Sequence, residues 1–422
     1  MTILIKAAKV VAHGNKNHLK HTDILIENGI ITRIKNFIPA RGGEKIIEHP
    51  HLCVSAGWLD MQAVSGDPGF EFKEDLDSLV KCAAAGGFTE VCVHQFNEPA
   101  LDNKAQIEYI KNKTRNKVVN VIPFGTITTK GKSDDLTEMY DMKMSGAAAF
   151  SNYKNPVKNS GTMLRALLYA KNLNTPVINH CSEESLAGKG QMNEGETAVA
   201  LGLKGIPALA EELMLQRDIM LLQYAGGKLH VPLISSKGSV ELIKKAKSSG
   251  LHITCGVSPV HLLFDESELN DFDSHAKLNP PLRNKKDMRA LRSALEQGVI
   301  DVIASDHCPQ DTESKELEFD LAEFGMINLQ TAFGCALTAL KEKHIEQIIA
   351  SLTANPRKIL NLKQVKLEVG ETANLTLFTC REDSVLSEEN NHSKSKNTFL
   401  FGKKLQGKVY GIVNGSKSFF TS

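Results

Sequence analysis

The stretch GWLDMQAVSGDPGFEFKED, residues 57–75, begins as a hydrophobic strand, passes Asp60 and reaches a Pro-Gly turn. A carboxylate at the end of a buried strand, followed by such a turn, is typical of the approach to a metal site. Between Asp60 and the turn, however, stand Gln62, Val64 and Gly66. The stretch therefore predicts the strand and the turn of a metal site without most of its donor side chains.

The strand in this stretch, at about 54–62, is the first of eight apolar, β-prone runs in the middle of the chain. The other seven lie at about 88–95, 117–127, 147–152, 176–181, 228–236, 252–259 and 301–307. Helix-like stretches separate most neighbours, and Gly ends several of them, as a C-cap does. Eight strands that alternate with helices predict the α/β class and a closed (β/α)8 barrel of parallel strands. An open, doubly wound sheet is the alternative, because the number of strands depends on where the runs are cut.

Both ends of the chain are rich in short, alternating β-prone runs, at 2–50 and again at 373–380 and 407–416. The tripeptide ENG at 27–29 is typical of a hairpin turn between two of them. Residues 381–398 are polar and poor in apolar side chains, and they predict a mobile surface loop between the last strands. Two β-rich ends that flank a large middle predict one small β-sandwich formed by both termini. The predicted domains are the N-terminal part of the sandwich at 1–52, the barrel at 53–362 and the C-terminal part of the sandwich at 363–422.

The composition argues against several kinds of partner. Lys and Arg number 50 against 49 Asp and Glu, so the formal charge of +1 gives no reason to expect nucleic acid or an anionic membrane. The N-terminus has no signal-peptide pattern, and no apolar run reaches the length of about 18 residues that a membrane span needs. The eight cysteines are scattered without a CxxC pair, which is typical of reduced, buried thiols in a cytoplasmic protein.

Barrel enzymes use side chains at the carboxyl ends of their strands. Polar side chains stand at several of the predicted strand ends, but they do not add up to a set of metal ligands. In chain order, these ends carry Asp60, Gln62, Val64, His94, Gln95, Phe96, Asn152, Tyr153, His180, Leu233, Pro259, His261, Asp306 and His307.

Longer motifs accompany these strand ends: AAAGGFTEV at 83–91, GAAAFSN at 146–152, NHCSEE at 179–184, MNEGE at 192–196, LNPPLR at 278–283 and DVIASDHCPQ at 301–310. Together with residues 57–75, they resemble the cyclic amidohydrolases, most closely the dihydroorotases of the multifunctional-complex type. The resemblance covers nearly the whole chain. It implies a distorted (β/α)8 barrel of the TIM type and a sandwich made from both termini. It also implies one or two zinc ions, which lower the pKa of a bound water for attack on a cyclic amide.

The resemblance assigns roles to single residues. It places the strand-eight carboxylate, which moves the proton, at Asp306. The metal-ligand positions fall on Asp60, His180 and Asp306. The substrate-pocket positions fall on Asn279, Phe96, Tyr153 and Gln310. Active members carry metal-binding histidines, a bridging carboxylate or carboxylated lysine, and a substrate-binding arginine. At those positions this chain has Gln62, Val64 and Leu233, then Asn152 or Tyr153, and Gly66.

A zinc site needs at least three protein ligands. Val64 and Leu233 donate nothing and fill space with hydrocarbon, while Gly66 removes the clamp for a carboxylate substrate. The resemblance and these replacements predict a dihydroorotase-like protein of pyrimidine biosynthesis that lacks hydrolase activity. It would have a structural or regulatory role and need no cofactor.

The alternative is an active, zinc-dependent cyclic amidohydrolase that opens the ring of a cyclic amide. Its rebuilt, mononuclear site would lie around His180 and Asp306, with His94 as a further ligand. Cys181 and Cys308 are next to these two positions, and with His94 they form another candidate site for a soft metal.

A structural interpretation applies to several of the same residues. His180 is then a hydrogen-bonded histidine of the barrel, and Asp306 fixes the loop after strand eight by accepting backbone N–H groups. His230 and His261 are interpreted as structural rather than catalytic, and the two prolines in LNPPLR hold a rigid turn in any case.

Two further roles are compatible with an emptied site. A small-molecule binder would use the former pocket, where Phe96 and Tyr153 would stack on a flat ring. A scaffold would bind another enzyme of pyrimidine synthesis, and aspartate carbamoyltransferase is the partner that the resemblance implies. The resemblance also implies a homodimer.

Overall fold

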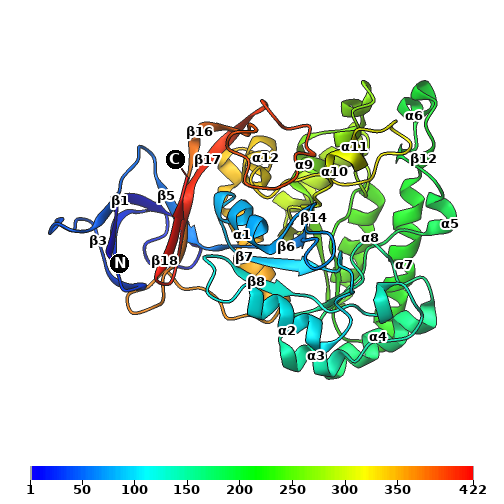
Figure 1. The fold of residues 1–422 in the computed structure, drawn as a ribbon, viewed down its shortest axis with the longest axis horizontal. Helices are drawn as coiled ribbons and strands as arrows, with labels where there is room; N and C mark the ends of the chain where they lie inside the picture. The colour runs from blue at the N-terminus through cyan, green and yellow to red at the C-terminus, as the bar shows by residue number, and fades with distance from the viewer. Residues whose placement is uncertain (1, 422) are drawn as a thin grey trace.

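The protein is described from a computed structural model that covers residues 2–421. Figure 1 shows two parts, with the strands of both chain ends on one side and strands that lie among helices on the other. The pairing of these inner strands arranges them as a ring of parallel strands. The ring contains all eight strands predicted from the middle of the sequence. They are β6 (Trp58–Val64), β7 (Phe88–His94), β8 (Asn120–Pro123), β9 (Phe150–Ser151), β10 (Val177–Ile178), β13 (Leu229–Val231), β14 (Ile253–Val257) and β15 (Val302–Ile303).

The ring consists of two parallel sheets that meet at two seams. One sheet has the order β6-β7-β8, and the other has the order β9-β10-β13-β14-β15. A single parallel bridge joins the sheets at each seam, from Gly125 to Phe150 and from Ala63 to His307. The strands therefore follow one another in the order that a barrel requires. The continuous ladder of a closed barrel is not found among residues 2–421.

Helices follow most of the ring strands and begin at side-chain caps. Asp75 accepts a hydrogen bond from the backbone N–H of Ser78 at 2.7 Å, and the amides of Asn159 and Asn284 cap two other helices in the same way. The longer helices are α1 (Leu76–Ala85), α2 (Lys104–Lys113), α4 (Ser160–Asn172), α7 (Ala208–Ala225), α8 (Lys237–Ser248), α10 (Lys285–Glu296), α12 (Ala332–Leu340) and α13 (Ile345–Leu352). The shorter ones are α3 (Met139–Ser145), α5 (Glu184–Ala187), α6 (Glu196–Leu201), α9 (Pro259–Leu263), α11 (Thr312–Lys315) and α14 (Ala354–Ile359).

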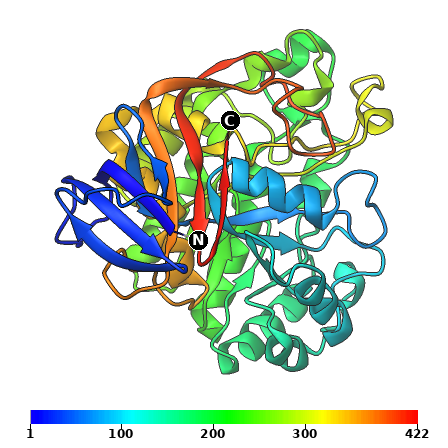
Figure 2. The ribbon, with the colours of Figure 1, turned by 60° about the vertical axis from the view of Figure 1, so that its left-hand side comes forward.

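Strands from both ends of the chain share one sheet, as Figure 2 shows from the side. The order is β18-β17-β16-β5-β1-β2-β3, with β4 paired to β1. The predicted hairpin at 27–29 is confirmed, because Asn28 and Gly29 join β2 to β3 with φ values of 51° and 81°. The two stacked layers of a sandwich stay a prediction, since the strands belong to one hydrogen-bonded sheet. Its strands are β1 (Thr2–Val10), β2 (His21–Glu27), β3 (Ile30–Lys35), β4 (Lys45–Ile47), β5 (Cys53–Ala56), β16 (Asn374–Val385), β17 (Lys404–Asn414) and β18 (Lys417–Phe420).

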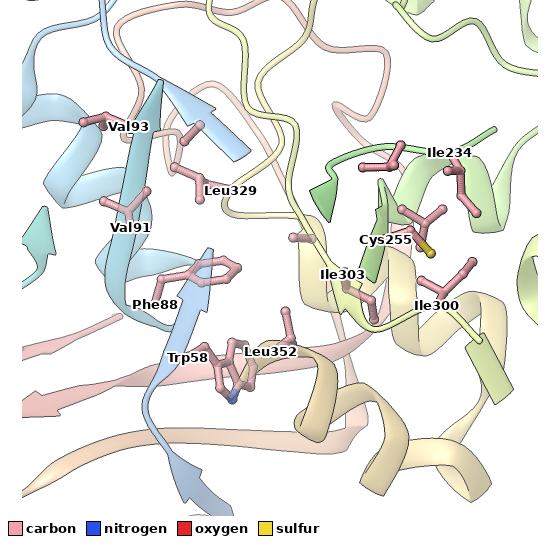
Figure 3. Packing of buried hydrophobic residues seen from close by; sticks show 14 of the residues in the cluster. Trp58, Phe88, Val91, Val93, Ile234, Cys255, Ile300, Ile303, Leu329 and Leu352 are labelled. Atoms are coloured by element: carbon pink, nitrogen blue, oxygen red, sulfur yellow. The ribbon is translucent and has the colours of Figure 1, made fainter. Parts of the chain in front are cut away.

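A large apolar core joins the terminal sheet to the ring. Trp58, at the start of β6, is fully buried, and its ring centroid lies 4.8 Å from that of Phe333 and 5.4 Å from that of Phe378 on β16. Its indole N–H donates to the hydroxyl of Ser55 at 3.0 Å. Figure 3 shows Trp58 and Phe88 side by side within this core. Burial of such aromatic side chains contributes several kcal/mol by area, about 25 cal/mol per Å².

The prediction of a mobile surface loop at 381–398 is wrong at both ends of the segment, while residues 387–392 between them lie at the surface. Its first residues continue β16 to Val385, and the rest crosses to the ring and packs there. Asn397 is 2% exposed and donates to the carbonyl oxygens of Cys308 and Gly325 at 3.0 Å each. The hydroxyl of Ser395 donates to the carbonyl oxygen of Lys73 at 2.7 Å. The segment is polar because its partners are buried backbone groups rather than water.

In the part of the chain that the structure describes, no helix combines the length and the apolar character that crossing a bilayer requires. All eight cysteines are buried and free, as predicted.

Candidate functional site

A cavity lies at the carboxyl ends of the ring strands, on the face where a barrel enzyme carries its site. Its volume is about 410 Å³, and Phe96, Tyr153, Asn279 and Gln310 all line it. These four residues are the ones predicted to form a substrate pocket, so the structure brings them together. The rings of Phe96 and Tyr153 pack edge to face, with centroids 6.2 Å apart. Each ring therefore already has an aromatic partner within the protein.

Lys154, which also lines this cavity, forms an ion pair with Asp306. Nζ of Lys154 lies 2.8 and 2.9 Å from the two carboxylate oxygens of Asp306. The two side chains are 12% and 6% exposed. Burial raises the pKa of Asp306, and the positive charge of Lys154 opposes that shift. The carboxylate predicted to move the proton is thus held by an ammonium group of its own chain.

Asp60 is fully buried on β6, and its carboxylate binds the last strand of the ring. The backbone N–H and the hydroxyl of Ser305 donate to its two oxygens at 2.6 and 2.8 Å. The backbone N–H of Gln62 donates to it at 3.2 Å. Burial outweighs these hydrogen bonds and raises the pKa of Asp60 to about 6. Asp60 therefore fastens the first ring strand to the segment that follows β15.

Apolar side chains occupy the space next to Gln62 and Val64. Val64 forms a small buried cluster with Tyr153 and Cys308, and Phe96 packs against it. Gln62 is fully buried, and neither end of its side-chain amide has a hydrogen-bond partner within the protein. At Val64 the cluster presents hydrocarbon, and not a donor atom, to the cavity that Phe96, Tyr153 and Cys308 line.

Gly66 stands where the resemblance places an arginine. The backbone turns tightly there, since the N–H of Phe70 donates to the carbonyl oxygen of Gly66 at 2.5 Å. A Cβ atom on Gly66 would lie 2.1 Å from the carbonyl oxygen of Phe70. The turn in this conformation therefore excludes every side chain at residue 66, an arginine included.

Asn152 and His94 are used by the protein's own backbone and side chains. The amide oxygen of Asn152 accepts from the N–H groups of Ile127 and Thr128 at 2.9 and 3.1 Å. Nε2 of His94 lies 2.9 Å from the carbonyl oxygen of Met61, so it carries the proton, and Nδ1 accepts from the hydroxyl of Ser151 at 3.1 Å. Burial lowers the pKa of His94 to about 4. Both residues hold neighbouring strands together.

His180 keeps both of its ring nitrogens without a hydrogen-bond partner in the protein, although it is only 2% exposed. Burial and the charge of Lys154 lower its pKa to about 3, and an interaction with the side chain of Asn279 opposes that shift. The imidazole is therefore neutral near pH 7. Of the three predicted ligands, His180 alone has a donor atom that no other group of the chain uses.

The remaining predicted positions lie inside the ring or beside it. Leu233 belongs to a buried cluster in which Met61 also takes part. Nδ1 of His230 lies 2.9 Å from the hydroxyl of Thr254, and burial lowers the pKa of His230 to about 3. Nε2 of His261 lies 3.0 Å from the carbonyl oxygen of Pro280, and burial lowers the pKa of His261 to about 4. These contacts agree with the structural interpretation of both histidines.

Metal donors do not converge at the strand ends. Within the described residues, one group of three His, Cys, Asp or Glu side chains has its donor atoms within 4.8 Å of one another. That group is His13, His18 and Glu346, and the side chain of His13 is 86% exposed. Cys181 and Cys308 take part in no such group, so the predicted soft-metal site is not formed.

Sequence reasoning missed three residues of this face: Lys154, Ser305 and Glu74. Glu74 is fully buried, accepts from the hydroxyl of Ser393 and lies 3.5 Å from Nε2 of His307. The partners of these three residues are 152, 245 and 319 positions away along the chain. No local pattern signals such pairs, although Lys154 lies only two residues after a predicted strand end.

Comparisons with known proteins agree with this architecture. The model of the family described as "Dihydro-orotase-like" matches residues 54–239. A protein named dihydroorotase from Acetivibrio thermocellus is 40% identical over 98% of both chains. Another of that name, from Trichlorobacter lovleyi, is 37% identical over the full length of both chains.

Solved structures share the fold at lower identity. The L-hydantoinase (dihydropyrimidinase) from Arthrobacter aurescens superposes with a TM-score of 0.85 at 21% identity, over 99% of this chain and 95% of that one. A D-hydantoinase gives a TM-score of 0.82 at 22% identity, with the same coverage. At this identity the likeness concerns the fold alone.

Proposed function

The chain belongs to the dihydroorotase family, and from that premise we propose that it has lost the family's hydrolytic chemistry and serves pyrimidine biosynthesis as a structural or regulatory homologue. The observation that carries this proposal is the ion pair between Lys154 and Asp306. A general base must accept a proton from a substrate or a water. Asp306 instead has a fixed ammonium group on both of its oxygens.

The donor set at the strand ends supports the proposal, because it does not fit a zinc ion. Zinc takes at least three N, S or O donors around an open position. Asp60 is engaged by Ser305, and Asp306 is engaged by Lys154. His180 offers one free imidazole, and hydrocarbon fills the space beside Val64. No hydrolytic step is assigned to this face.

The substrate side of the site supports the same conclusion. An arginine clamp binds a carboxylate with two parallel hydrogen bonds, and the turn at Gly66 excludes such a side chain. Gln310, at another predicted substrate position, is held by Nζ of Lys73 at 2.6 Å and by its own bond to the carbonyl oxygen of Phe324 at 3.0 Å. Groups that would contact a substrate are therefore committed to internal bonds.

The activity test uses the full chain, purified after growth with zinc, and both directions of the family reaction. Dihydroorotate and carbamoyl aspartate are supplied in turn, and the products are separated by chromatography. We expect no turnover above that of the Asp306→Asn variant. Turnover that depends on Asp306 would refute the loss of hydrolytic chemistry.

For the regulatory role, we propose aspartate carbamoyltransferase of the same organism, or another pyrimidine-pathway enzyme, as the protein partner. The support is the analogy to multifunctional dihydroorotases. In addition, the fold is shared with solved structures, while the polar side chains at the strand ends bind other groups of the same chain. Size-exclusion chromatography with light scattering, on the two purified proteins mixed at equal concentration, is expected to give a complex. Separate elution of the two proteins at micromolar concentration would refute the proposal that this enzyme is the partner.

An active cyclic amidohydrolase is the second candidate, and two observations favour it. Full-length relatives at 37–40% identity bear the name dihydroorotase, and His180 retains a free imidazole. Such an enzyme would need Lys154 to leave Asp306, which frees a carboxylate at the strand ends. The parent chain and the Lys154→Met variant together test this candidate. Zinc-dependent turnover by the parent that rises in Lys154→Met would support it, and no turnover by the parent would refute it.

A further inference from the structure

Three segments that are distant in the sequence pack on one another at one end of the molecule. They are residues 194–201 with α6, residues 265–276, and residues 312–323 with α11. Ala198, Leu269 and Phe319, one from each segment, share a small buried apolar cluster. Figure 1 shows α6 and α11 at the same end of the molecule, away from the terminal sheet. The three segments therefore present one joint surface to solvent.

Two buried lysines fix the third of these segments in place. Nζ of Lys277 donates to the carbonyl oxygens of Phe319 and Ala322 at 2.7 and 2.6 Å. Nζ of Lys315 donates to the carbonyl oxygen of Glu323 at 2.7 Å. Both ammonium groups thus lie beneath the surface, since Lys277 is 2% exposed and Lys315 is 1% exposed. A surface held in this way loses little conformational freedom when another molecule binds to it.

Large apolar side chains from all three segments stand in solvent. Val199 is 82% exposed, Phe272 is 47%, Leu317 is 48% and Leu321 is 61% exposed. The ring of Phe272 lies edge to face with that of Phe319, with centroids 6.4 Å apart, so it extends the buried cluster to the surface. Exposed apolar side chains that gather in one place are typical of a surface that binds another molecule.

Carboxylates flank these apolar side chains in all three segments. They are Glu194, Glu196, Asp265, Glu266, Glu268, Asp271, Asp273, Glu313, Glu316, Glu318, Asp320 and Glu323. Lys403 binds Glu268 at 2.6 Å, and within residues 2–421 no other carboxylate of this set forms an ion pair with lysine or arginine. The whole chain is nearly neutral, with a formal charge of +1. This surface therefore concentrates negative charge.

The outer face of α7 is also apolar, but it lacks a charge of one sign. Met220 and Tyr224 are exposed there, and the exposed polar side chains beside them, Gln216 and Gln223, are neutral. A neutral face does not select a partner by charge. The three acidic segments do, because a surface of one sign favours a partner of the opposite sign and rejects a partner of its own.

We propose that this acidic–apolar surface, formed by residues 194–201, 265–276 and 312–323, is a docking site for a basic, amphipathic segment of another protein. Apolar side chains of that segment cover Phe272 and Leu321, and its lysines and arginines meet the carboxylates around them. Nucleic acids and anionic membranes are repelled by the same negative charge. The inference does not rest on the loss of hydrolysis, so its test and the activity test have separate outcomes.

The test uses a fluorescein-labelled peptide of about 18 Lys and Leu residues, spaced so that the Leu side chains follow one face of a helix. Fluorescence anisotropy measures its binding to the full chain at about 0.1–100 µM protein. We expect a Kd of about 10 µM or below that rises with added salt, because salt screens the charges. A peptide with Glu in place of each Lys should not bind. No binding of the basic peptide, or equal binding of both peptides, would overturn the proposal.

A charge-reversal variant locates the binding. Glu316→Lys/Glu318→Lys should raise the Kd of the basic peptide at least about 10-fold, because like charges then face one another. The matched control is Glu48→Lys/Glu368→Lys, which changes two exposed carboxylates beside the terminal sheet by the same charge. The control should bind the peptide as the parent does. Equal losses in both variants would show that net charge alone governs binding and would overturn the proposal.

An apolar variant tests the other half of the surface. Leu317→Ser/Leu321→Ser should raise the Kd at least about 10-fold and keep the circular dichroism spectrum of the parent. Ile46→Ser/Val369→Ser, at residues that are 50% and 59% exposed elsewhere, should leave the Kd unchanged. Sedimentation velocity of the chain alone should give the same mass for the parent and both variants. A mass that decreases only in Leu317→Ser/Leu321→Ser would mean that a second copy covers the surface, and it would overturn the proposal, as would an unchanged Kd.

Discussion

The strand-end face of the ring and the outer face of α7 are opposite in character. At the strand ends, polar side chains such as Asp60, Asn152 and Asp306 are buried and bonded to the protein itself. On α7, large apolar side chains such as Met220 and Tyr224 stand in solvent. Buried polar groups need partners, and exposed apolar stripes tend to be covered by other molecules. The first face has satisfied most of its polar groups from within the chain, with Gln62 and His180 as exceptions, whereas the apolar side chains of the second stand in solvent.

Interaction with other molecules is therefore expected at exposed apolar surfaces such as the outer face of α7 rather than at the strand ends. A fold can be retained while its site changes, because the fold depends on packing and the function depends on a few side chains. Changes at the strand ends should therefore act on stability. Changes on α7 should act on association and leave the stability of the single chain nearly unaltered.

The largest expected effect is a loss of stability in acid. Burial lowers the pKa of His94 and His261 to about 4 and of His180 and His230 to about 3, so these rings stay neutral in the folded chain while the unfolded chain binds protons below about pH 6.5. Each ring then removes about 1.4 kcal/mol per pH unit down to its lowered pKa. Asp60, with its pKa raised to about 6, acts in the opposite sense between about pH 4 and 6, and so do Asp218, Asp301 and Asp306, whose pKa values burial also raises. The net loss is therefore smaller than the sum over the four rings. Urea unfolding at pH 7, 6 and 5 measures the sum.

The variant His230→Leu isolates one of these contributions. We expect its free energy of unfolding to fall less steeply with acid than that of the parent, by about 1.4 kcal/mol per pH unit below pH 6.5. Between pH 7 and 8 the two proteins should change in parallel, because the ring is neutral in both states. Equal slopes below pH 6 would show that His230 is protonated in the folded chain.

The next effect concerns the buried ion pair. Lys154→Met leaves the carboxylate of Asp306 buried without its counter-charge, and removal of one partner of a buried pair costs about 3–5 kcal/mol. Adding Asp306→Asn should recover much of that loss. Lys132→Met, at an exposed lysine of the same cavity, is the control and should change stability by less than about 0.5 kcal/mol. A Lys154→Met variant as stable as the control would mean that the pair is not formed in solution.

A smaller effect is expected at the turn that replaces the arginine. In Gly66→Ala the new Cβ would lie 2.1 Å from the carbonyl oxygen of Phe70, so the turn must shift, at a cost of about 3 kcal/mol. Gly195→Ala is the matched control, because its nearest neighbour would be 3.6 Å away and its φ of 166° suits any residue. Thermal unfolding compares the two variants. Equal melting temperatures would contradict the closed turn.

The smallest effect is expected on α7. The change Tyr224→Ser should alter the free energy of unfolding by no more than about 0.5 kcal/mol, because the ring is 82% exposed. Urea unfolding measures it. A decrease of more than about 2 kcal/mol in the free energy of unfolding would show that Tyr224 packs within the single chain. It would contradict the difference proposed between the two faces.

The strands and turns could be predicted from the sequence because their signals are local. The eight apolar runs and the Asn-Gly hairpin each depend on a few neighbouring residues. The bonds of the strand-end face could not, because Ser305 reaches Asp60 across 245 positions of the chain. The packing of the polar segment at 381–398 could not be predicted for the same reason, since the partners of Asn397, Cys308 and Gly325, are distant in sequence.

The most direct test of the central claim is the zinc content of the full chain, expressed with zinc and purified without chelator, measured by inductively coupled plasma mass spectrometry. Because Asp60 and Asp306 are bonded to Ser305 and Lys154 of the same chain, we expect no zinc site at the strand ends. The double variant His180→Ala/Asp306→Ala should therefore bind as much zinc as the parent. Any bound zinc should then be lost on His13→Ala, at the one other group of donors in the described chain. About one zinc per chain that disappears with His180 and Asp306 would contradict the account, because it would require a working metal site where the structure has an ion pair.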